Sequence, residues 1–117
     1  MIQLFPYESF KEGVASAKSN LLWEGAGHTS VIYTNDEKKA EYVGEELPVG
    51  RLVVNQAGGA ASGGNYINGL HPTMSLGCGS WGNNSISENL TYKHLMNVTK
   101  LAYYHDCTMP SLDEVWL

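Results

Sequence analysis

His28-Thr29-Ser30-Val31-Ile32-Tyr33-Thr34 and Arg51-Leu52-Val53-Val54-Asn55 are the two stretches that decide the fold. The first is rich in β-branched and aromatic residues and the second is a short apolar run, so both are typical of strands. The chain between them is polar, with Ala40, Val43 and Leu47 at helical spacing. Strand, helix and strand in this order predict a right-handed βαβ unit with parallel strands. We therefore expect an α/β fold.

Both expected helices begin at a recognisable signal. Ser9 and Glu12 fit the S-x-x-E capping box, in which two otherwise unpaired amides at a helix start are satisfied. Thr34 and Glu37 fit the same pattern before the second helix, which we expect to run to about Leu47. The apolar stripe predicted for the first helix is Phe10, Val14, Ala17, Leu21 and Leu22. Residues that favour helix ends follow the two helices: Gly25 and Gly27, then Pro48 and Gly50.

The second half of the chain has weaker signals. Residues 56–69 are rich in glycine and are predicted to form a loop, because glycine makes the backbone flexible. A loop of this length is usually either functional or disordered. Ser87 and Glu88 are expected to begin a short helix to about Met96, and residues 98–104 suit a closing strand. We expect the acidic tail, residues 109–117, to dock on a surface. The chain is thus divided into residues 1–56 with the βαβ unit, a loop region at 57–86 and a C-terminal part at 87–117, all within one compact unit.

Length and charge limit the function classes. The chain has 117 residues and a formal net charge of −5, which suits one domain with a modest core. Without a Lys/Arg cluster it is not expected to bind nucleic acid or an anionic membrane. No apolar run approaches the ~20 residues of a spanning helix, and the first residues do not resemble a signal peptide. We therefore expect a cytoplasmic location.

The cysteines and histidines do not predict a disulfide or a metal site. Cys78 and Cys107 are the only cysteines, and in a cytosolic protein both are expected to be reduced. The four histidines lack the spacing of a zinc site. The run His105-Asp106-Cys107 places two possible ligands together, and chance is the better explanation of it.

Gly77, Gly79 and Gly82 spell the G-x-G-x-x-G pattern of dinucleotide-binding loops. That fingerprint requires a strand before it, a helix opening on its last glycine and an acidic residue about 20 positions later. Here the preceding residues make a poor strand, the expected helix starts too late, and the acidic position falls on residues 101–103. A tight glycine turn around a packed Trp81 explains the pattern better.

Four other side chains are candidates for a site. Cys78 could act as a nucleophile with His71 as its base, although a small buried or loop-lining thiol is the simpler interpretation. His28 lies at a strand start, where it either faces a site or makes local hydrogen bonds. Asn55 follows the second strand, where open α/β sheets gather ligands, so a site-lining role and a structural role are equally supported.

Three segments resemble a known family. The segment Glu24-Gly25-Ala26-Gly27-His28-Thr29-Ser30-Val31-Ile32 resembles the helix-to-strand segment of aldehyde dehydrogenases, and residues 51–55 resemble the strand after it. More specific is Leu76-Gly77-Cys78-Gly79-Ser80-Trp81-Gly82-Asn83-Asn84-Ser85-Ile86-Ser87-Glu88-Asn89-Leu90-Thr91-Tyr92-Lys93-His94-Leu95-Met96-Asn97. It is similar to the C-terminal segment of the coenzyme A-acylating branch, which includes the acetaldehyde dehydrogenase half of bifunctional aldehyde-alcohol dehydrogenases. The resemblance covers nearly the whole chain from Phe10 onward.

The resemblance implies a reaction and a larger subunit. In the family an aldehyde adds to a cysteine thiolate, a hydride passes to NAD(P), and the thioester passes to coenzyme A. The family's subunit has three parts: a Rossmann-like cofactor domain, a catalytic domain and an oligomerisation strand. The nucleophile motif matches neither Cys78 nor Cys107, and the cofactor domain precedes the matching region. The resemblance therefore implies no catalytic residue and no bound cofactor within this chain, which corresponds to part of the catalytic domain plus the oligomerisation strand.

The resemblance also implies where two segments lie. The segment Gly77–Asn84 lies near the mouth of the substrate channel, and residues 98–104 resemble the strand used in subunit pairing. Together with the two candidates Asn55 and His71, this segment supplies the expected lining of the channel: Gly77, Cys78, Gly79 and Ser80.

Three functions remain open. The chain is either the C-terminal portion of an acylating aldehyde dehydrogenase, inactive alone, or a stand-alone oligomerising or interaction module without enzymatic activity. A third hypothesis gives Cys78 its own thiol chemistry. The first two predict a homo-oligomer, because unpaired strand edges and apolar patches recruit another chain. The remaining part of the enzyme is a further expected partner.

Overall fold

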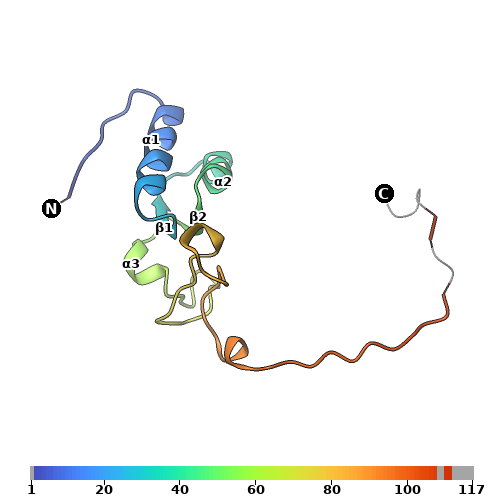
Figure 1. Cartoon of the computed structure of the whole chain (residues 1–117). Helices are drawn as coiled ribbons and strands as arrows, with labels where there is room; N and C mark the ends of the chain where they lie inside the picture. Colours follow the sequence, from blue (N-terminus) through green and yellow to red (C-terminus); the bar gives the residue numbers. More distant parts are fainter. Residues whose placement is uncertain (1, 108–109, 112–117) are drawn as a thin grey trace.

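The computed structural model describes residues 2–107 and 110–111. It contains a parallel pair of strands, in which Thr29 lies opposite Arg51 and Val31 opposite Val53. The predicted parallel βαβ unit is therefore confirmed (Figure 1). The elements in chain order are α1 (Phe10–Trp23), β1 (Gly27–Ile32), α2 (Glu37–Glu46), β2 (Val49–Val54), α3 (Gly58–Ala61) and two short 3-10 helices, η1 (Ser80–Gly82) and η2 (Tyr92–Leu95).

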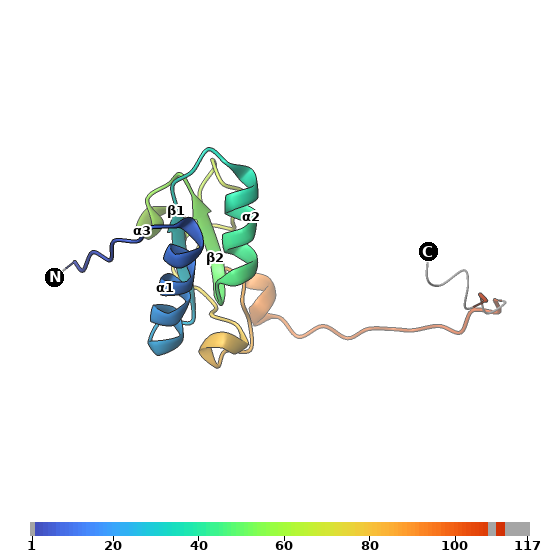
Figure 2. The same ribbon diagram turned by 90° about the horizontal axis from the view of Figure 1, so that it is seen from above.

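The core lies where α1 and α2 pack together on the strands (Figure 2). Its buried centre is Val14, Val43 and Leu47. Partly buried residues surround this centre: Phe10, Ala17, Leu21, Ile32, Tyr42, Val49 and Leu52. The predicted stripe of α1 is thus confirmed except at Leu22, which is 65% exposed.

The two helix starts differ from each other. Ser9 caps α1 by accepting a hydrogen bond from the Glu12 amide, while the Glu12 carboxylate accepts one from the Glu8 amide. The capping box predicted at Thr34 is wrong, because the N-cap of α2 is Asp36, which accepts from the Lys39 amide. The backbone of Thr34 is instead hydrogen-bonded to the Asn55 side chain, so Thr34 continues the line of β1.

The helix predicted to start at Ser87 is also wrong. Residues 87–90 are extended, because the Glu88 carbonyl accepts from the Gly77 amide and the Leu90 amide donates to the Ser75 carbonyl. Between these bonds, Asn89 forms an antiparallel bridge with Leu76. Only the last turn is helical: η2 begins after Thr91, whose side chain and backbone form a capping box with His94.

The strand predicted at residues 98–104 is absent from the described part of the chain. This segment runs away from the rest of the molecule (Figure 1), and every residue from 95 to 107 is exposed. A strand needs a hydrogen-bonding neighbour, and the folded part of the chain lies too far from this segment to supply one. Apart from residues 110 and 111, the predicted docking of the tail lies outside the described residues.

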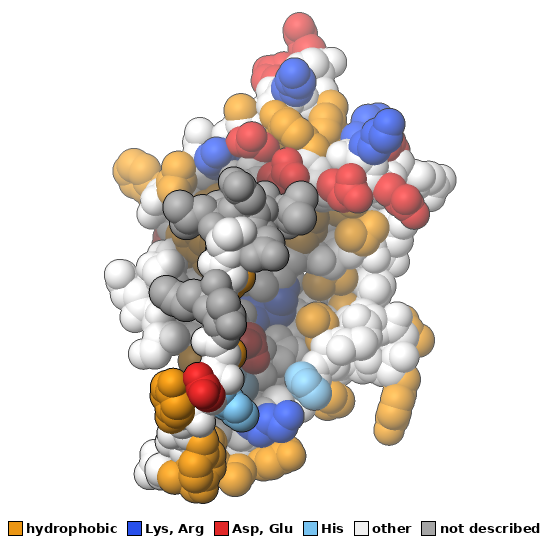
Figure 3. Space-filling model, turned by 90° about the vertical axis from the view of Figure 1, so that its right-hand side faces the viewer, with side chains coloured by type: hydrophobic (Ala, Val, Ile, Leu, Met, Phe, Trp, Pro, Cys, Tyr) orange, Lys and Arg blue, Asp and Glu red, His pale blue; other side chains and the backbone are white. Residues whose placement is uncertain are grey.

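The surface carries many apolar side chains. Figure 3 shows most of the charged side chains toward the upper end of one face, with hydrophobic side chains exposed at both ends. Trp23 is 89% exposed and Leu95 is 84% exposed. Among the described residues, no helix combines the length and the hydropathy required to cross a membrane.

Candidate functional site

Residues 76–89, here named the Cys78 loop, form a hairpin-like turn at one end of the sheet. The bridge between Leu76 and Asn89 closes it. Inside the bridge, the Gly79 amide donates to the Ile86 carbonyl at 2.8 Å, and the Cys78 amide donates to the Asn84 side chain at 2.9 Å. Gly77, Cys78 and Gly79 are buried, whereas Ser80 is exposed.

The chain's own atoms fill the space around the glycines of this loop. A Cβ at Gly77 would overlap the Ile86 carbonyl, and one at Gly82 would lie 2.5 Å from the Cys78 Cβ. A Cβ at Gly79 would lie 3.1 Å from the Trp81 ring, which covers this glycine although it is itself 51% exposed. The glycine turn is thus tight as predicted, but the expectation of a packed Trp81 is wrong, because that side chain is half exposed. The glycines serve internal packing, so the loop does not fit the phosphates of NAD(P) or coenzyme A.

Cys78 lies beside a histidine, but not the expected one. Its Sγ is 3.8 Å from Nδ1 of His28, which is exposed at the start of β1. The His71 side chain is exposed, and its backbone carbonyl accepts from Asn89. The structure therefore places a weak sulfur–imidazole contact in the loop, at a cysteine that is only 9% exposed.

Asn55 lies apart from this loop. It directly follows β2 and donates its amide to the carbonyl of Ile32, the last residue of β1. The Cys78 loop packs instead on Gly27, the first residue of β1. Because the strands are parallel, the two lie at opposite ends of the sheet. Asn55 has a φ of 54° and both polar atoms of its side chain bind the Thr34 backbone, so it has a structural role here.

Two buried polar residues that sequence reasoning missed hold the loop together. Arg51 is 7% exposed, and its Nη2 donates to the Gly77 carbonyl at 2.9 Å. Asn89 is 6% exposed, and its side-chain oxygen accepts from Nη1 of Arg51 at 3.3 Å. The signal that could have revealed Arg51 is a charged residue inside an otherwise apolar strand, since a buried charge requires hydrogen-bonding partners.

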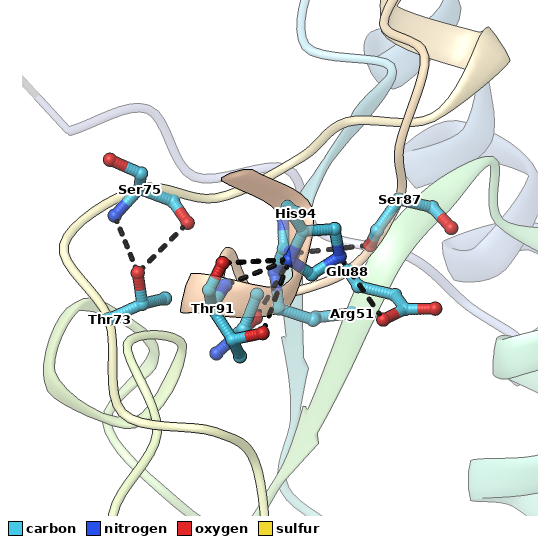
Figure 4. A network of polar contacts seen from close by, with 8 residues as sticks. Arg51, Thr73, Ser75, Ser87, Glu88, Thr91 and His94 are labelled. Carbon is cyan, nitrogen blue, oxygen red and sulfur yellow. Dashed lines mark hydrogen bonds and ion pairs between the residues drawn. The ribbon is translucent and has the colours of Figure 1, made fainter. Parts of the chain in front are cut away.

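The segment after the loop has a polar anchor of its own (Figure 4). Nδ1 of His94 accepts from the Thr91 amide at 2.9 Å, and its Nε2 lies 3.6 Å from a Glu88 carboxylate oxygen. A cavity of about 590 Å³ is lined by residues of two segments, 71–75 and 90–95. In the first of these segments, the Thr73 hydroxyl accepts a hydrogen bond from the Ser75 amide. His71 and Tyr92 are among the residues that line this cavity.

Relatives of known sequence agree on one family, although no protein-family model matches the chain. The succinate-semialdehyde dehydrogenase (acetylating) of Clostridium kluyveri is 50% identical over 111 residues, which are 94% of this chain and 24% of that enzyme. The sulfoacetaldehyde dehydrogenase (acylating) of Cupriavidus necator is 38% identical over 87% of this chain and 21% of that enzyme. The bifunctional aldehyde-alcohol dehydrogenase of Escherichia coli is 35% identical over 86% of this chain and 12% of that enzyme.

Solved structures give the same result. The acetylating aldehyde dehydrogenase of Geobacillus thermoglucosidasius matches with a TM-score of 0.77 and 35% identity, over 90% of this chain and 23% of that one. A probable aldehyde dehydrogenase of Listeria monocytogenes matches with the same TM-score of 0.77 and 31% identity, over 93% of this chain and 23% of that one. The chain is therefore a homologue of the acylating aldehyde dehydrogenases, and it spans about a quarter or less of the length of these relatives.

Proposed function

We propose that these residues are the C-terminal portion of a subunit that oxidises an aldehyde to an acyl-CoA with NAD(P). The observation that carries this proposal is 50% identity to an acetylating dehydrogenase over 94% of the chain. A TM-score of 0.77 to an acetylating aldehyde dehydrogenase supports it independently. In this proposal the reacting cysteine and the cofactor domain lie outside the 117 residues.

The Cys78 loop is the part of this chain that we place at the mouth of the substrate channel. Its buried backbone at Gly77, Cys78 and Gly79 gives the channel a rigid wall, and Ser80 and His71 are exposed beside it. Because chemistry requires a nucleophile and a cofactor that the loop does not supply, the chain alone has no dehydrogenase activity. When bound elsewhere in the subunit, NAD(P) accepts the hydride and coenzyme A accepts the acyl group.

We propose an aldehyde with an acidic group as the substrate. Two relatives, 50% and 39% identical to this chain, are named for succinate semialdehyde and for sulfoacetaldehyde. The aldehyde-alcohol dehydrogenase of Escherichia coli, at 35%, is more distant. A carboxylate or sulfonate distinguishes the first two substrates from simple aldehydes.

A chimera tests the family function directly. This chain would replace the matching segment of the Clostridium kluyveri enzyme, and NAD(P)H formation would be followed with succinate semialdehyde and coenzyme A. We expect an active chimera, and a Cys78→Ala chimera should still turn over because the nucleophile lies elsewhere. An inactive but folded chimera contradicts the proposal, and so does turnover by the isolated chain. Preference for acetaldehyde would overturn only the proposed substrate class.

The exposed apolar side chains of residues 96–104 favour a second candidate, a stand-alone oligomerising module. Met96, Val98, Leu101, Tyr103 and Tyr104 are each at least 58% exposed on the extended segment. Pairing with a second copy would cover them. Light scattering at micromolar concentration should then show a homo-oligomer, and a monomer would contradict this candidate. The predicted cytoplasmic location stays a prediction.

A further inference from the structure

We propose that Arg51 and Asn89 act together as a positioning pair that fixes the Cys78 loop on the sheet and keeps the Cys78 thiol covered. The positioning of the loop follows from contacts within this chain. Its meaning for a substrate channel rests on the proposed function. Neither residue is proposed to touch the reacting atoms.

The first support is the buried guanidinium of Arg51. It donates to four neutral oxygens, and in the described part of the chain it forms no ion pair. Burying a charge is costly unless hydrogen bonds compensate, and here the four acceptors provide that compensation. The flat guanidinium presents donors in a fixed fork, which a lysine ammonium cannot reproduce.

The second support is that the four acceptors lie on three segments: β1, the Gly77 side of the Cys78 loop and the Ser87–Asn89 side. Nε donates to the Thr29 hydroxyl on β1 at 3.1 Å, and Nη2 donates to the Gly77 carbonyl. Nη1 reaches the Ser87 carbonyl at 3.5 Å and the Asn89 side chain at 3.3 Å. Gly77 and Ser87 lie on the two opposite sides of the Cys78 loop, so one side chain ties both sides to the sheet. Figure 4 shows the contact between Arg51 and Ser87.

Asn89 extends the same network to the preceding segments. Its Nδ2 donates to the Ser62 carbonyl at 3.0 Å and to the His71 carbonyl at 2.9 Å, while its oxygen accepts from Arg51. Each of its polar atoms is therefore used. The Asn89 amide thus binds the chain before the loop, at Ser62 and His71, and the Arg51 guanidinium binds the loop itself.

The consequence concerns Cys78, which directly follows Gly77. Its carbonyl packs on Gly27 and its Sγ lies near His28, so the thiol is covered only while the loop stays on the start of β1. Loss of the Arg51 donors would remove these hydrogen bonds from the buried Gly77 carbonyl and from the Ser87 carbonyl on the opposite side of the loop. The loop would then open locally before the rest of the domain unfolds.

The rate of Cys78 modification measures this opening. In a Cys107→Ser background Cys78 is the sole thiol, and its reaction with a maleimide can be followed in the folded 117-residue chain. We expect Arg51→Ala to react at least about tenfold faster, as expected when hydrogen bonds to a charged group are lost. Lys38→Ala, which removes an exposed cation on α2, is the matched control and should react at the parent rate.

Rescue separates positioning from general stability. Guanidinium chloride at a low, non-denaturing concentration should slow labelling of Arg51→Ala toward the parent rate, and urea at the same concentration should not. Arg51→Lys keeps the charge but loses the fork, so it should also react faster. A parent-like rate in Arg51→Lys would overturn the proposal, as would an Arg51→Ala variant that guanidinium does not slow. Because no activity is measured, these results are independent of the chimera experiment.

Discussion

Gly27 packs directly against the backbone carbonyl of Cys78, fifty-one positions later in the chain. A side chain at Gly27 would overlap that carbonyl oxygen, and the φ of Gly27 is +82°. Gly27 is also the first residue of β1 and its amide donates to the Pro48 carbonyl at 2.7 Å. The strand start, the turn before β2 and the Cys78 loop therefore meet at one residue that has no side chain.

Gly27→Ala is expected to destabilise the chain by about 3 kcal/mol, because a left-handed φ costs an alanine 1–2 kcal/mol and the overlap adds to it. Urea unfolding followed by circular dichroism measures the loss. Gly59→Ala is the matched control: no atom lies within 4 Å of its Cβ position and its φ is ordinary. That variant should be neutral or stabilised by up to about 1 kcal/mol. Equal midpoints for both variants would contradict the close contact.

Local patterns predicted the first half of the fold well. The spacing of Val14, Val43 and Leu47 indicated which helix faces are buried, and the apolar run at 51–55 indicated a strand. These signals are sufficient because each depends on residues a few positions apart. The parallel arrangement then follows from the helical connection.

The second half depends on contacts that no local pattern contains. Asn89 has hydrogen-bond partners 18, 27 and 38 positions away, and they hold residues 87–90 extended where Ser87 and Glu88 suggested a helix. Residues 98–104 have strand-like composition, but a strand forms only beside a partner. The candidate site was located only in part for the same reason. Cys78 was identified from composition, whereas His28 came beside it through the fold.

The cap of α2 gives a second prediction. Asp36→Ala removes the acceptor of the Lys39 amide and should cost about 1 kcal/mol, while Asp36→Asn keeps an acceptor and should cost much less. Thr34→Ala would remove the hydroxyl that accepts from the Asp36 amide, a weaker loss. Thermal or urea unfolding ranks the three variants. A larger loss in Thr34→Ala than in Asp36→Ala would mean that Thr34 is the cap after all.

A third prediction compares two leucines. Leu47 is 7% exposed and lies in the core, so Leu47→Ala should cost about 2–5 kcal/mol. Leu101 is 78% exposed on the extended segment. In a dilute sample, Leu101→Ala should change the free energy of unfolding by no more than about 0.5 kcal/mol. At concentrations where the chain self-associates, Leu101→Ala should instead weaken association. A concentration series by light scattering would show this, and an unchanged series would exclude Leu101 from the association surface.

A fourth prediction tests whether Asn55 stabilises the fold or lines the substrate channel. With a φ of 54° and two side-chain hydrogen bonds to Thr34, of 2.9 Å and 2.8 Å, it joins the ends of β1 and β2. Asn55→Gly keeps the backbone conformation and loses both bonds, which should cost about 1–2 kcal/mol. Asn55→Ala loses the bonds and also strains the backbone, so its loss should be larger by about 1 kcal/mol. In the chimera with the Clostridium kluyveri enzyme, Asn55→Gly should leave KM for succinate semialdehyde unchanged below the unfolding temperature. A raised KM in a variant of normal stability would show instead that Asn55 lines the channel.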